Sequence, residues 1–235
     1  MAGKKTFFNW SSGKDASLAL FRLMQDNAFD VQRLLTTVNG YHNRVSMHGL
    51  RHSLLQAQAS AIGIPLQVLE LPEQPSMSEY DALMSKTLEG LKKEGFEAAA
   101  FGDIFLEDLR KYREEKLKAE NLDVVFPLWK EDTHLLVRSM ITLGFKMITV
   151  CVNGNLLDES FVGREVDASF LSDLPGNVDP CGENGEFHTF CYDGPVFKTP
   201  VAFETGEKVL RTYENPDKTA GEKWEVWFCD LLPKN

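Results

Sequence analysis

Residues 7–17, FFNWSSGKDAS, join an apolar segment to a turn of small residues and then to a helical segment. We expect a strand at residues 5–9, and the spacing of apolar residues predicts a helix over 15–26. Gly13 lies in the turn and permits backbone conformations that are closed to other residues. A helix N-terminus presents unpaired N–H groups and the positive end of its dipole, so this arrangement favours the binding of a phosphate group.

The polar side chains of this loop strengthen that interpretation. Lys14 adds a positive charge, which we expect to be exposed, while Ser11, Ser12 and Ser17 supply hydroxyl donors. Asp15 either caps the helix or helps to hold a magnesium ion. The loop is not a Walker A loop, which needs an earlier glycine and a serine or threonine after its lysine. An ordinary strand–turn–helix with a serine or aspartate cap stays open as the alternative.

The composition is typical of a soluble globular protein. The 235 residues are 43% hydrophobic and 26% charged, which fits one large or two modest domains. A formal net charge of −10 argues against a nucleic-acid-binding surface but not against a local phosphate site. Because no apolar run is long enough for a membrane span and no signal-peptide pattern is present, we expect a cytoplasmic protein without a membrane partner. The oligomeric state, including a homo-oligomer, is left open.

Strand-like and helix-like segments alternate through the first half of the chain. Alternation of this kind predicts an α/β fold with a parallel sheet wrapped by helices. After the first strand and helix, we expect strands at 31–38, 66–71, 98–101 and 124–126, and helices at 51–62, 76–94 and 107–120.

The pattern changes beyond residue 129. A predicted helix at 133–143 is followed by strands at 147–152, 186–192, 201–204, 208–213 and 223–231. These elements predict a smaller α+β domain. We therefore divide the chain into domains at 1–130 and 131–235, with residue 153 as the competing boundary.

A second polar motif, DPCGENGEFHT, occupies residues 179–189. It places carboxylates, an amide and a histidine in a turn punctuated by glycines. Taken alone, it is also compatible with a polar hairpin loop whose tight turn is Asn184-Gly185.

Both motifs resemble those of known enzymes. SSGKDAS is similar to the SGGxDS loop of the PP-loop ATP pyrophosphatases, with Ser12 at a position where the family usually has glycine and Ala16 in place of a frequent serine. GENGEFHT resembles the signature of the diphthine–ammonia ligase family, and further similar segments stand in the same order at 47–49, 102–104, 126–129 and 163–164. The resemblance implies an N-terminal ATP-binding domain of the HUP type with a five-stranded parallel sheet, a family-specific C-terminal domain, and a substrate cleft between them.

Residues 105–113, FLEDLRKYR, depart from the family pattern. Members that amidate diphthine typically carry a Tyr-Gln-rich segment there, whereas this stretch resembles that of uncharacterised bacterial homologues. The departure puts the acceptor substrate in question and leaves the nucleotide chemistry in place.

The resemblance implies an ATP- and Mg²⁺-dependent reaction in which a substrate carboxylate is adenylated, pyrophosphate leaves, and ammonia or an amine displaces AMP. The nucleotide-binding residues it implies are Ser11, Ser12, Gly13, Lys14, Asp15, Ser17, His48, Gly102 and Asp103, of which Asp15 and Asp103 would hold the metal. The substrate-binding residues would be Glu183, Asn184, Glu186 and Thr189, and the catalytic residues Lys14, Glu186 and His188. The alternatives are another PP-loop enzyme, such as an adenylating thiolation enzyme, and a nucleotide-binding regulator without turnover.

Overall fold

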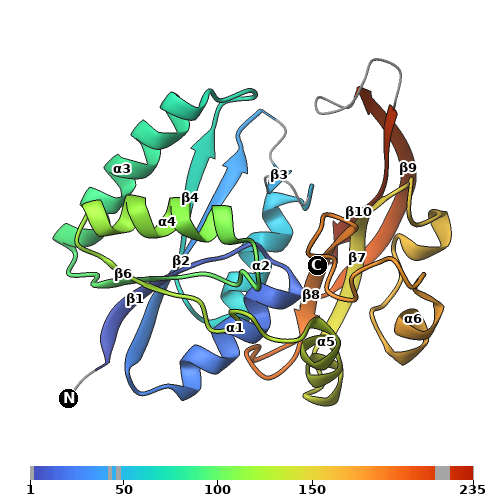
Figure 1. Ribbon diagram of the computed structural model, residues 1–235, viewed down its shortest axis with the longest axis horizontal. Coiled ribbons are helices and arrows are strands. Elements are labelled where there is room, and N and C mark those ends of the chain that lie inside the picture. Colours follow the sequence, from blue (N-terminus) through green and yellow to red (C-terminus); the bar gives the residue numbers. More distant parts are fainter. Residues whose placement is uncertain (1–2, 42–43, 46–48, 215–222, 235) are drawn as a thin grey trace.

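The computed structural model describes residues 3–41, 44–45, 49–214 and 223–234, which form two β-sheets with helices packed between and around them (Figure 1). His48, one of the expected nucleotide-binding residues, lies outside the described residues.

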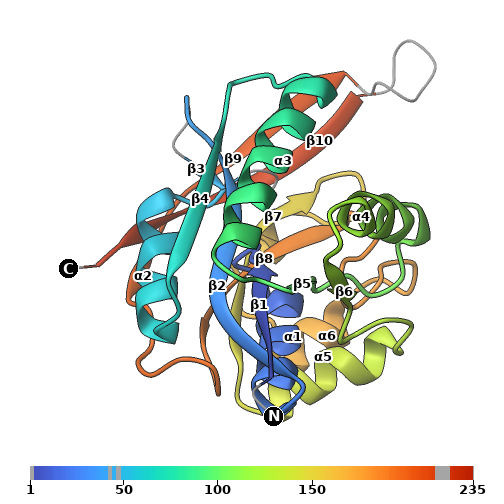
Figure 2. The same ribbon diagram turned by 90° about the vertical axis from the view of Figure 1, so that its left-hand side faces the viewer.

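The N-terminal sheet is built on five parallel strands. These are β1 (Lys4–Asn9), β2 (Phe29–Asn39), β4 (Leu66–Leu71), β5 (Ala98–Ala100) and β6 (Asp123–Val125). In space β4 pairs with β2, β2 with β1, β1 with β5, and β5 with β6, an order that can be followed from left to right in Figure 2. The predicted five-stranded parallel sheet is therefore confirmed. A sixth strand, β3 (Arg44–Val45), pairs antiparallel with the end of β2 and was not expected, since two residues leave no pattern in the sequence.

Helices cover both faces of this sheet, and successive side chains of β1 point to opposite faces. Phe7 and its neighbours on adjacent strands pack with α3 (Met77–Lys93) and α4 (Glu107–Ala119). Phe8 points the other way and packs in the cluster that includes α1 (Lys14–Gln25) and α2 (His52–Ile62). A capping box starts α3, because Ser76 and Glu79 bond reciprocally. Gly13 is the N-cap of α1 with no side-chain cap bond, so the capping role considered for Asp15 is not found.

The C-terminal sheet is antiparallel, in the order β8-β7-β10-β9. Its strands are β7 (Lys146–Asn153), β8 (Phe187–Asp193), β9 (Phe203–Glu214) and β10 (Lys223–Pro233), and its helices are α5 (Thr133–Thr142), the short η1 (Glu159–Phe161) and α6 (Ala168–Asp173). The two short strands expected at 201–204 and 208–213 are the single strand β9. Gly206, where the two expected strands would separate, lies inside β9 at a bulge in which residues 206 and 207 face Asp230 of β10 alone.

The two halves share one hydrophobic core. Helices α1 and α2 lie between the two sheets (Figure 1), and the apolar cluster that contains Phe8 and Leu54 continues through Met140 of α5 to Phe190 of β8. The first half is thereby fixed against the second. The division at residue 130 stays a prediction. No helix in the described part of the chain combines the length and the apolar character that a membrane crossing needs.

Candidate active site

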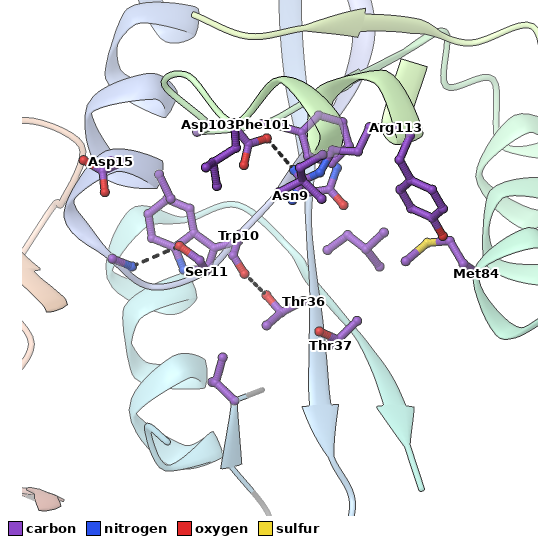
Figure 3. Close-up of a pocket in the computed structure, with 18 of the residues that line it drawn as sticks. Asn9, Trp10, Ser11, Asp15, Thr36, Thr37, Met84, Phe101, Asp103 and Arg113 are labelled. Atoms are coloured by element: carbon purple, nitrogen blue, oxygen red, sulfur yellow. Dashed lines mark hydrogen bonds and ion pairs between the residues drawn. The ribbon is translucent and has the colours of Figure 1, made fainter. Parts of the chain in front are cut away.

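A cavity of about 910 Å³ opens where β1, β2 and β5 end, and the 181–189 loop of the C-terminal half closes one side of it. Ligands of open α/β sheets typically bind at the carboxyl ends of the strands. The volume lies in the upper part of the range for small-molecule sites. Figure 3 shows residues from β1, β2, α3 and the segment after β5 around this space. Of the expected site residues, Ser11, Gly13, Lys14, Asp15, Gly102, Asp103, Glu183, His188 and Thr189 line the cavity.

The loop between β1 and α1 takes its shape from Ser12. Ser12 has a φ of 72°, in the left-handed region that favours glycine, whereas Gly13 has a φ of −86°. The expectation that Gly13 takes the special conformation is therefore wrong, and Ser12, which stands where the similar SGGxDS motif has its first glycine, takes it instead. Neither Ser12 nor Ser17 lines the cavity, and Ser17 Oγ donates a 2.9 Å hydrogen bond to the carbonyl of Gly13. These two serines build the loop and do not face a ligand.

Lys14 is held by the C-terminal half of the chain. Lys14 is only 2% exposed, so the expectation of an exposed lysine is wrong. Its Nζ lies 2.8 Å from Oδ2 of Asp15 and donates to the carbonyl of Cys181, while its backbone N–H donates to Oγ1 of Thr189 at 3.1 Å. Burial, the largest single influence, would lower the pKa of Lys14, but the charge and hydrogen bond of Asp15 together with Cys181 and Glu183 outweigh it, and the pKa lies above its usual value. Lys14 is therefore a buried, charged ammonium at the cavity wall.

Two carboxylates of this cavity have buried oxygens without a hydrogen bond. They are Oδ1 of Asp15 and Oδ2 of Asp103, although the latter lies 2.7 Å from Nη1 of Arg113 as an ion pair. Within the described residues, no group of three or more His, Cys, Asp or Glu side chains could hold a metal ion by itself. Mg²⁺ is commonly bound through one or two carboxylates together with substrate phosphates. Oδ1 of Asp15, which has no hydrogen bond, and the carboxylate of Asp103 fit that kind of site.

Gly102 contributes through close packing. A Cβ atom placed on Gly102 would lie 2.9 Å from the backbone nitrogen of Ala16, so any larger residue would push the end of β5 away from the first turn of α1. Gly102 thus keeps Asp103 and Asp15 at the same end of the cavity.

Glu183 has an acidity that is unusual for a carboxylate. Burial, together with the negative charges of Asp15 and Asp103, raises its pKa to about 7, against the opposing charge of Lys14. A group that titrates near neutral pH is suited to accept and release a proton during a reaction.

His188 also lines the cavity, and burial and the positive charge of Lys14 lower its pKa to about 4. The imidazole is therefore neutral at physiological pH. It offers hydrogen bonds to a ligand but is not a proton donor of the imidazolium kind.

Glu186 and Asn184 do not line the cavity. Glu186 is 2% exposed, and its Oε1 accepts hydrogen bonds from the Asp179 N–H and the Asn184 side chain, both at 3.0 Å. Its Oε2 accepts from the backbone N–H of Asn184 at 2.9 Å. This geometry supports the interpretation that Glu186 braces the loop.

Replacing Glu186 with glutamine is expected to lower the free energy of unfolding by about 1–3 kcal/mol. Both carboxylate oxygens accept hydrogen bonds from N–H groups, so the new NH₂ group would lose at least one of these bonds and face another donor. Turnover per folded molecule should be retained. Urea unfolding and an ATP-turnover assay on the same preparation distinguish this from a catalytic role, for which turnover would collapse while stability stayed near that of the parent.

Comparison with known proteins agrees with the two-part architecture. The family model described as the diphthamide synthase N-terminal domain matches residues 4–121, and the diphthamide synthase C-terminal domain matches residues 132–215. The chain belongs to the diphthamide synthase family. The resemblance of its motifs to this family is thereby confirmed, and membership implies the use of ATP.

Curated relatives carry the name diphthine–ammonia ligase. The Rattus norvegicus protein is 32% identical over 127 residues, which cover 52% of this chain and 47% of the relative, and the Homo sapiens protein is 31% identical over the same share. The Danio rerio protein is 26% identical over 177 residues, 68% of this chain and 69% of the relative. The match thus spans about half the length of the mammalian relatives.

Two residues that face or support the cavity were not predicted from the sequence. Arg113 lies in a helix rich in charges, where nothing marks one arginine from the next. Gln58 is fully buried on α2, and its spacing with Leu54 and Ile62 puts a glutamine in line with apolar residues on one face. That polar interruption of an apolar helix face is the signal that could have revealed it.

Proposed function

We propose that this protein is an ATP-dependent amide ligase of the diphthine–ammonia ligase type, which adenylates a carboxylate and then transfers it to ammonia or an amine. The observation that carries the proposal is one cavity lined by Lys14 and Asp15 from the β1–α1 loop and by Glu183 from the GENGEFHT motif. Membership of the diphthamide synthase family supports the same chemistry.

In the first step a carboxylate oxygen attacks the α-phosphorus of ATP, and the bond to the bridging oxygen of pyrophosphate breaks. Lys14 carries three N–H donors, of which Asp15 and Cys181 take two among the described residues, so one is available for a phosphate oxygen. Its charge is maintained by the neighbouring Asp15 and stabilises the negative charge that develops on the leaving pyrophosphate. Mg²⁺ held by Asp15 and Asp103 would neutralise further phosphate charge.

In the second step ammonia or an amine attacks the acyl carbon and AMP departs. The nitrogen must lose a proton as the amide forms, and Glu183, with a pKa of about 7, is placed in the cavity to accept it. His188 is neutral and serves as a hydrogen-bonding group for phosphate or acceptor. These assignments give the catalytic role to Glu183 instead of Glu186.

The remaining walls provide room for the nucleoside and for an acceptor. The apolar side chains of Leu35 on β2 and of Met84 and Leu88 on α3 line the cavity and suit a base. Arg113, which lies 2.7 Å from Asp103, would contact an anionic acceptor on the same side. The names of the relatives make diphthine the first acceptor to test.

The test supplies the protein with ATP, Mg²⁺ and ¹⁵N-ammonium, together with a diphthine-containing protein or a panel of small carboxylates. The proposal expects ¹⁵N in a new amide, with one AMP formed per amide. ATP consumption that is unaffected by every carboxylate and yields no labelled amide would contradict it.

A further inference from the structure

Gln58 is a buried amide that connects the two halves of the chain behind the cavity. It lies on α2 with 0% of its surface exposed, and it does not line the cavity. It therefore has no direct route to a ligand, although three structural elements meet on its side chain.

The Gln58 side chain accepts one hydrogen bond and donates two. Its Oε1 accepts from the indole N–H of Trp10 at 2.7 Å. Its Nε2 donates to the carbonyl of Ser12 at 3.0 Å and to the carbonyl of Cys191 at 2.6 Å. An indole N–H only donates and a carbonyl only accepts, so the orientation of the amide is fixed. No other side chain of this length offers one acceptor and two donors in this arrangement.

The contact with Ser12 is made at the strained point of the loop. Ser12 has a φ of 72°, a conformation that costs a non-glycine residue energy and persists only where its surroundings hold it. Its carbonyl receives one bond from Gln58 and a second, at 3.0 Å, from the backbone N–H of Cys191 on β8. These two donors fix the peptide plane that precedes Gly13 and Lys14.

We propose that Gln58 is a positioning residue for the nucleotide: by tying Ser12 to β8, it holds the β1–α1 loop in the conformation that binds ATP. The inference rests on the proposed function, since it assumes that ATP binds at this loop. It also makes the binding loop depend on the C-terminal sheet, because Cys191 and Thr189 of β8 hold Ser12 and Lys14 respectively.

The test is Gln58→Met, which keeps the length of the side chain and removes its hydrogen bonds. ATP affinity, measured by calorimetry on the full chain well below the melting temperature, is expected to fall at least tenfold. The matched control is Leu231→Ala on β10, which creates a void in the C-terminal sheet at a residue that is 2% exposed and does not line the cavity. At a comparable loss of stability, this control should keep the affinity of the parent within about twofold.

A second variant separates positioning from general destabilisation. Glycine adopts the conformation of Ser12 without strain, so Ser12→Gly should recover at least part of the affinity lost in Gln58→Met. If Gln58→Met does not fold, Gln58→Asn, which keeps the amide but is one methylene shorter, takes its place.

Parental affinity in the folded Gln58 variant would overturn the inference, and so would a loss that Ser12→Gly does not reduce. Failure of the proposed function looks different, because the unmodified protein itself would then form no amide or bind no ATP, whatever residue stands at position 58.

Discussion

Lys14→Ala is expected to lower ATP turnover by at least about 100-fold, the usual effect of removing a preorganised group from developing negative charge. Lys14 is a charged ammonium at the cavity wall, and its neighbours Asp15 and Cys181 hold it in a fixed position. Calorimetric titration with ATP should show weaker binding as well, because a full positive charge is lost beside the phosphates. Unchanged ATP affinity in the folded variant would place the nucleotide elsewhere.

The same substitution should also destabilise the protein, by about 3–5 kcal/mol if the carboxylate of Asp15 stays ionised without its partner. The side chain of Asp15 is 21% exposed, so solvent screening makes the lower end the better expectation. The control is the double variant Lys14→Ala/Asp15→Asn, which removes both charges of the pair. It should recover most of the stability in urea unfolding without recovering turnover.

Glu183→Gln is expected to lower amide formation by about 10²- to 10⁴-fold, the typical contribution of a general base, while ATP binding changes little. The parent protein should gain activity as pH rises through about 7, since Glu183 with its pKa of about 7 must be ionised to accept a proton. The residual activity of the variant should lack this step. An unaltered pH–rate profile in Glu183→Gln would exclude the proposed role.

Stability provides an independent measurement on Glu183. Its pKa rises from an ordinary 4.5 to about 7 in the folded state, so the folded protein binds more protons between these values. The protonated Glu183 side chain therefore contributes to the stability of the folded protein below pH 4.5, and this contribution is lost as pH rises through 7. Glu183→Gln should therefore be more stable than the parent at pH 8 by about 1–3 kcal/mol, with the difference disappearing near pH 4. A difference that does not depend on pH would contradict the shifted pKa.

The parallel sheet could be predicted from the sequence because each of its strands is a short apolar run followed by a helical segment. The two parts of the fold that were not predicted, β3 and the continuous strand β9, depend on pairing between strands. Residues 44–45 form β3 only because the end of β2 is available beyond the last residue of β1. Gly206 stays inside β9 because the pairing accommodates an extra residue there, with residues 206 and 207 opposite Asp230 alone.

The location of the site could also be predicted, but not the state of its side chains. Lys14 is buried because Cys181 and Thr189, more than 160 positions away in the chain, pack on it. Glu183 and Glu186 stand in one motif and look equivalent in the sequence. The 182–185 turn, closed by the Gly185 N–H on the carbonyl of Gly182, leaves the first facing the cavity and the second inside the loop. Such differences follow from tertiary packing and leave no trace in residue spacing.

The most direct test of the central claim is the identity of the products formed from ATP. Purified protein, freed of contaminating kinases and phosphatases, is supplied with Mg²⁺, ATP labelled at the α- and γ-phosphates, ammonium and a carboxylate acceptor, with Lys14→Ala as the blank. Attack of a carboxylate at the α-phosphorus predicts AMP and pyrophosphate in equal amounts, and their absence from the blank. ADP and inorganic phosphate as the products of the acceptor-dependent reaction would contradict adenylation and with it the proposed function.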